Sequence, residues 1–211
     1  MPISLVAVGA KVTAAVTNSI INLLNLQGAT GVVPTSVAVT GGGATGSVGT
    51  YGKVIFSTAT AVSINGCFTS TYDNYEIIFD LTTSAAAGLN LTLRLSGTDA
   101  ITAYDSQRFT AINATAAAAQ SLNAANWIGS GGSGIAGATQ SGSIKLFSPA
   151  VAVATRARID NNITANPMTT SSTLYIGALL HRTIAAYDGI TFTPASGTIT
   201  GSARIIGYNN L

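Results

Sequence analysis

The sequence predicts a mainly β protein, an antiparallel β-sandwich of jelly-roll-like type with one short N-terminal α-helix. Three observations lead to this fold class. Apolar residues make up 47% of the 211 residues, which is enough for a hydrophobic core. Short apolar or alternating runs follow one another from residue 53 onward, with turn residues between them. Only one segment is convincingly helical, whereas a parallel sheet would need a crossover helix for each strand pair.

Residues 11–27 are expected to form the helix. Its apolar residues recur at spacings of three and four, as in one apolar stripe: Val12, Val16, Ile20, Leu23 and Leu24. Gly28 follows as a residue that commonly ends a helix. Because so short a helix needs a partner to pack against, we expect residues 1–30 to be an anchoring or oligomerisation segment.

The rest of the chain is expected to be a Gly-rich connector over residues 31–52, with a candidate short strand at residues 37–39, and a β-sandwich domain over residues 53–211. The leucines of 89–96 alternate with polar residues, which is typical of a strand with one buried face. The Ala-rich segment 114–125 is expected to be a loop or a short helix across one end of the sandwich. The expected strands are residues 53–57, 62–65, 75–81, 89–96, 107–111, 143–147, 155–160, 173–181, 190–193 and 198–208.

Charge is scarce in this chain. Only 8% of the residues are charged, and the nine basic residues are scattered with a net charge of +2, so we expect no nucleic-acid partner. No apolar run is long enough to span a membrane, and no basic segment precedes the first apolar run as in a secretory signal. The single cysteine excludes an internal disulfide framework and a Cys-rich zinc site. We therefore expect a structural or binding protein without cofactor or catalytic metal; calcium stays open.

Catalytic motifs are weak throughout the sequence. Residues 41–46 and 129–134 match GxGxxG, but neither opens a helix as a dinucleotide site requires. His181 has no nucleophile elbow to serve and is expected to be an edge-strand residue. The candidate carboxylate pairs, Asp73 with Glu76 or Asp80 and Asp99 with Asp105, are expected to lie in turns and on strand faces. We expect no enzyme.

Two aromatic residues are the best candidates for ligand contact. Tyr104 and Trp127 fall in segments expected to be loops, where tyrosine and tryptophan make rigid contact surfaces for sugars or proteins. The alternative for each is packing in the core.

Several phrases of the sequence carry a family resemblance. Residues 9–25 (GAKVTAAVTNSIINLLN), 33–37, 62–78 and 187–208 resemble segments of tailed-bacteriophage virion structural proteins, of the minor tail protein, tail fibre or head fibre type. The resemblance implies an oligomeric β-sandwich, commonly a trimer, attached to other virion proteins by its N-terminus after assembly in the host cytoplasm. Its exposed loops would contact host-surface glycan. A capsid decoration protein and a stand-alone carbohydrate-binding module are the alternatives.

Overall fold

The computed structural model describes residues 30–113, 115–130, 136–164 and 172–209. The chain divides into two compact units, Met1–Thr30 and Gly31–Leu211. Apart from Thr30, the described residues all belong to the second unit. The helix expected over residues 11–27 lies outside the described residues, and so do the residues of its stripe, Val12, Val16, Ile20, Leu23 and Leu24.

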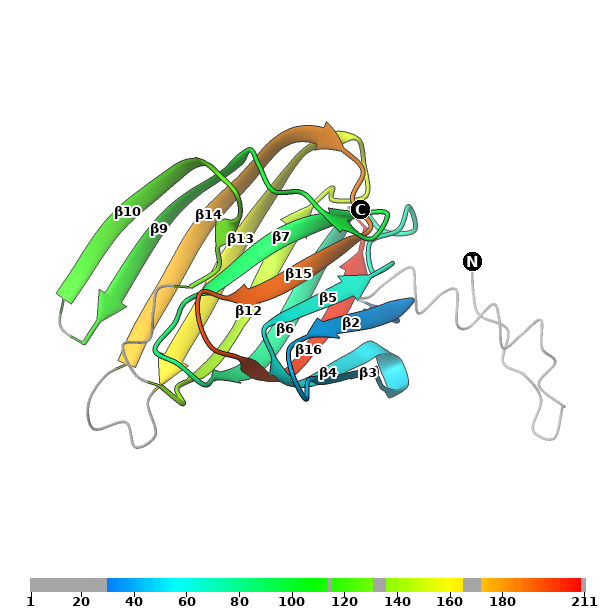
Figure 1. Ribbon diagram of the computed structural model, residues 1–211. Helices are drawn as coiled ribbons and strands as arrows, with labels where there is room; N and C mark the ends of the chain where they lie inside the picture. The colour runs from blue at the N-terminus through cyan, green and yellow to red at the C-terminus, as the bar shows by residue number, and fades with distance from the viewer. Residues whose placement is uncertain (1–29, 114, 131–135, 165–171, 210–211) are drawn as a thin grey trace, which may run out of the picture. The chain divides into compact units, whose positions relative to one another are not determined.

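The second unit is mainly β and consists of two antiparallel sheets (Figure 1). The larger sheet contains β1 (Thr30–Val32), β3 (Thr45–Val48), β4 (Lys53–Ala59), β6 (Asn74–Thr83), β9 (Tyr104–Ile112), β10 (Thr115–Ala124), β12 (Thr139–Phe147), β13 (Val153–Thr164), β14 (Ser172–Ala185) and β16 (Ile199–Tyr208). The smaller sheet contains β2 (Ser36–Thr40), β5 (Ala61–Asn65), β7 (Leu89–Leu95), β8 (Thr98–Asp99), β11 (Trp127–Ile128) and β15 (Gly189–Pro194).

The strand order shows how distant parts of the chain meet. The larger sheet runs β10-β9-β14-β13-β12-β6-β16-β4-β3, with β1 paired to β16, and the smaller runs β11-β7-β15-β5-β2, with β8 paired to β7. A single turn of 3-10 helix, η1 (Thr50–Gly52), precedes β4. Within the described ranges there is no α-helix. The chain changes sheet between β6 and β7 and again between β14, β15 and β16, so neither sheet is a continuous stretch of sequence.

The expected strands are confirmed, since each of them overlaps a strand of the structure. The candidate strand at residues 37–39 lies within β2, where Val37 and Val39 pair with Ile64 and Val62 in the smaller sheet. One other expectation is wrong. Residues 114–125 form neither loop nor helix: they become β10, because pairing with β9 overrides the helix preference of alanine.

The core lies between the facing sides of the two sheets. In β6, alternate residues from Tyr75 to Leu81 are buried, and Ile77 lies in register with Ile144 of β12 and Ile205 of β16. The smaller sheet contributes the alternating leucines of β7, apart from Leu95 at the exposed end of that strand. Phe79 of β6 contacts Phe192 of β15 across the two layers, with ring centroids 6.0 Å apart. Hydrophobic burial between the sheets therefore holds the two layers together.

The larger sheet has a second face, which points away from the core. This face is solvent-exposed and carries both charged and apolar side chains. Lys145 of β12 lies between Glu76 of β6 and Arg158 of β13 in register, and its Nζ is 3.9 Å from the Glu76 carboxylate. We call this face, which points away from the smaller sheet, the outer face.

Candidate functional site

The β9–β10 hairpin forms one margin of the larger sheet (Figure 1). β10 is the last strand and pairs only with β9 among the described strands, with Ala118 opposite Phe109 and Gln120 opposite Gln107. Nearly all of its residues are exposed, on both sides of the sheet. An edge strand presents backbone N–H and C=O groups that have no partner strand. This margin therefore has backbone groups available for pairing.

A bulge limits the regular part of β10. The register shifts between Ser121 and Ala124, and Asn123 has a positive φ of 53°. The Asn123 backbone N–H donates to the Asp105 carboxylate over 2.8 Å, and Arg182 binds both the Asn123 side-chain oxygen at 3.0 Å and the Asp105 carboxylate at 3.1 Å. These contacts fix the C-terminal end of β10, so its regular edge covers residues 115–121.

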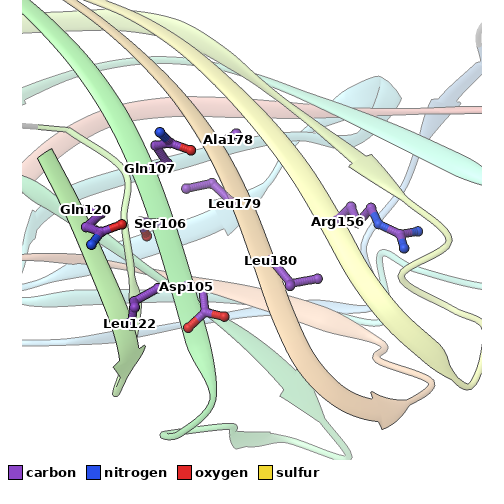
Figure 2. A pocket seen from close by; sticks show the side chains of 9 residues that line it. All are labelled: Asp105, Ser106, Gln107, Gln120, Leu122, Arg156, Ala178, Leu179 and Leu180. Carbon is purple, nitrogen blue, oxygen red and sulfur yellow. The ribbon is translucent and has the colours of Figure 1, made fainter. Parts of the chain in front are cut away.

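A hollow of about 280 Å³ lies beside this edge and opens on the outer face (Figure 2). Its lining comes from β9, β10, β13 and β14: Asp105, Ser106, Gln107, Gln120, Leu122, Arg156, Ala178, Leu179 and Leu180. Ala178 of β14, Gln107 of β9 and Gln120 of β10 lie in register across three neighbouring strands. One short side chain therefore lies beside two amide side chains. Figure 2 shows Leu122 and Arg156 on opposite sides of the hollow. Amides, a carboxylate and a guanidinium beside leucines suit a ligand that carries hydroxyl groups.

Tyr104 and Trp127 do not lie on this surface, which corrects the expectation that they contact a ligand. Both are fully buried, and their ring centroids are 5.2 Å apart. The Trp127 Nε1–H donates to the Leu180 carbonyl over 2.9 Å, and the Leu93 N–H donates to the Tyr104 hydroxyl over 2.7 Å. Burial raises the pKa of Tyr104 well above its usual range. Both side chains are packed in the core, which was the alternative expected from the sequence.

His181 is a core residue and not the edge-strand residue that the sequence suggested. It lies on β14, between β13 and β9, and only 1% of it is exposed. Its Nε2 is 3.0 Å from the Thr102 carbonyl and its Nδ1 is 3.0 Å from the Tyr187 hydroxyl. Burial lowers its pKa below the usual value. With both ring nitrogens bonded and the ring covered, His181 has no access to a substrate.

The acidic residues are engaged in separate local contacts. Glu76 pairs with Lys145, and the Asp80 carboxylate accepts from the Ser141 hydroxyl over 2.8 Å. Asp99 binds Arg94, and Asp105 binds Arg182. Asp73 lies beside β6, where its N–H donates to the Asn209 side chain. In the part of the chain that the structure describes, no group of three or more His, Cys, Asp and Glu side chains is placed to hold a metal ion.

Sequence reasoning missed two features. The first is the edge strand β10, which has no buried face and therefore no alternating pattern in its sequence. The second is the network around Arg94, whose guanidinium donates to Ser63, Asn65, Asp99 and Thr191 on three other strands and to the Gly97 carbonyl. The turn residues between Arg94 and Asp99 could have indicated that these two side chains meet. Nothing local in the sequence indicated that β5 and β15 lie beside them.

Comparison with protein-family models, with curated proteins and with solved structures finds no match for this chain. Across the described ranges, no helix is long and apolar enough to cross a membrane.

Proposed function

We propose that this chain is a structural protein of a bacteriophage virion, most simply a tail fibre or minor tail component. Its N-terminal segment attaches it to other virion proteins and joins the copies into a homo-oligomer, most simply a trimer. Its two sheets then form a jelly-roll-like sandwich that is displayed on the particle and contacts the host surface. The chain acts through binding and assembly and not through catalysis.

The observation that carries this proposal is the number of large apolar side chains that the second unit leaves exposed. Ile184 is 73% exposed, Ile101 67% and Leu122 65%, in a chain with only 8% charged residues. Exposed apolar surface is a feature of proteins that bury it against partners. A subunit of a large particle has such partners. Its own surface needs few charged residues for solubility, because it stays in solution as part of the particle and not as a free subunit.

The hollow beside β10 supports the contact with the host. Gln107, Gln120 and Arg156 offer hydrogen-bond donors, Asp105 offers an acceptor, and Leu180 adds an apolar patch. Saccharide hydroxyl groups need this combination of donors and acceptors. We therefore assign host-surface glycan as the ligand class of the proposed function.

The experiment that tests the proposal is immunogold labelling of purified particles with an antibody against this chain. Label at the tail or its tip supports a tail fibre or minor tail protein. Label spread over the head makes the chain a capsid decoration protein or head fibre. Particles without label, together with a monomeric chain that binds saccharide, leave the stand-alone carbohydrate-binding module as the function.

A second experiment tests the attachment through the N-terminal segment. Deletion of residues 1–30 removes the first unit and leaves the second, which has its own core. We expect the shortened chain to fold but to be absent from particles, because the anchor is gone. A shortened chain that still enters particles at the normal level would show that attachment uses another surface.

A further inference from the structure

We propose that β10 is a self-association edge: it pairs antiparallel with β10 of a second copy of this chain, so that two larger sheets continue into one. This inference goes beyond the proposed function and does not rest on it, because it concerns the free chain in solution. Its partner is a second copy, and the contact is separate from any contact made by residues 1–30.

The backbone of β10 calls for a strand as partner. Along one edge, β10 is paired with β9 from Thr115 to Ser121 without interruption. Along its opposite edge, β10 has no neighbour among the described strands. In an antiparallel ladder every second residue turns its N–H and C=O toward the neighbouring strand, so half of these groups face outward along this edge. A further strand pairs all of them at once.

The side chains of β10 favour a copy of itself over a charged partner. The strand contains no charged residue and no proline, and Ala116 to Ala119 form its centre. Natural edge strands are commonly protected by lysine, by proline or by a bulge within the strand. Here the bulge comes only at the end, after Ser121. In a twofold pairing each residue near the axis meets its own type, so an uncharged centre avoids like charges facing each other.

The other edges of the two sheets are less suited to pairing. β3, at the opposite margin of the larger sheet, has 4 residues. In the smaller sheet β11 and β8 have 2 residues each, and β2 has 5. β10 has 10 residues and is the longest strand at a sheet margin in the described part of the chain.

A twofold axis perpendicular to the sheet makes the two β10 strands antiparallel and keeps both outer faces on the same side. The two hollows then open in the same direction on one continuous surface. Residues of β9 and β10 line each hollow, and neighbouring strands lie about 5 Å apart, so both hollows come close to the axis. The pairing itself does not depend on what the hollow binds; with the saccharide site of the proposed function, it would present two sites to one target and strengthen binding without new contacts.

The test uses the full chain in sedimentation velocity, over concentrations from micromolar to millimolar because a backbone joint of this size is weak. We expect the unit present at the lowest concentration to double in mass as concentration rises. Ala118→Lys and Ala118→Glu each place a like charge near the axis, and each should weaken doubling roughly fivefold or more. An equal mixture of the two variants should double again, because opposite charges then meet.

Ser47→Lys is the matched control, since Ser47 is exposed on β3 at the opposite margin of the same sheet. It should leave doubling unchanged. Amide hydrogen exchange gives a second readout: the outward-facing N–H groups of residues 115–121 should become protected at high concentration in the wild type and not in Ala118→Lys. The proposal is overturned if the wild type does not double, if Ala118→Lys and Ala118→Glu double normally, or if Ser47→Lys weakens doubling as much as they do.

Discussion

The Tyr187 hydroxyl lies 3.0 Å from Nδ1 of His181, on the opposite side of the buried imidazole from the Thr102 carbonyl. Nε2 of the same ring faces the Thr102 carbonyl, which can only accept a hydrogen bond. Nε2 must therefore carry the proton, and Nδ1 accepts from the Tyr187 hydroxyl. A neutral ring satisfies both partners, and burial among Tyr104, Trp127 and Tyr187 disfavours the charged imidazolium.

We expect the fold to lose stability below neutral pH because of His181. Burial lowers the pKa of His181 in the folded state, so the unfolded chain binds its proton first, near pH 6.5. The stabilisation is present above pH 6.5 and is lost as pH falls toward the folded pKa, at up to about 1.4 kcal/mol per pH unit. Urea unfolding between pH 8 and pH 5 measures this slope. The variant His181→Gln should show a flatter dependence, and equal slopes in both proteins would contradict the assignment.

The pair of Arg94 and Asp99 is expected to stabilise the smaller sheet. Arg94 is 8% exposed and its Nη1 lies 2.5 Å from the Asp99 carboxylate, which also accepts from Thr191. Asp99→Asn leaves a covered guanidinium without its counter-charge and should lower the free energy of unfolding by about 1–3 kcal/mol. Asp160→Asn is the control, because Asp160 and Arg158 pair at the surface, where about 0.5 kcal/mol is expected. If both variants lost the same free energy of unfolding in urea, the charge of Asp99 would not be what stabilises Arg94.

The sequence was informative where one face of a strand is buried and uninformative where neither is. The alternation in β7 and the apolar run in β6 reflect burial against the other sheet, so both strands were predicted close to their bounds. β10 has no buried face, so its residues carry no period-2 pattern, and alanine suggested a helix instead. His181 was expected on an edge strand, and the sequence left core packing or ligand contact open for Trp127. The reason is related: long-range contacts decide whether an aromatic ring is covered, and these join β9, β11 and β14.

The hollow was not predictable for the same reason. Its lining residues lie between positions 105 and 180, and only the strand order brings Gln120 beside Gln107 and Gln107 beside Ala178. No local pattern marks these residues, since glutamine and alanine on exposed strand faces have many roles. Glu76 and Asp80, in contrast, were correctly assigned to one face of a strand, because their spacing follows strand alternation, whereas Asp99 was expected in a turn and lies on β8.

Cys67 is expected to be unreactive in the folded protein. It is fully buried and its Sγ contacts the Ile64 carbonyl, while burial raises the pKa of its thiol well above the usual value. The thiolate is the reactive form, so both access and ionisation are suppressed. A thiol-exchange reagent at pH 8 should release little signal from the native chain and one equivalent in denaturant, since this is the only cysteine. Rapid labelling of the native chain would show that this corner of the smaller sheet opens easily.

Trp127 is the single tryptophan and should report core packing and not ligand binding. Its ring is fully buried against the rings of Tyr104 and His181, and its indole N–H donates to the Leu180 carbonyl. We expect emission near that of an apolar environment, weak quenching by acrylamide, and no change on addition of saccharide. Gln120→Ala, at the hollow, should weaken saccharide binding without altering the emission. Strong quenching in the native state, or quenching that saccharide relieves, would return Trp127 to the binding surface.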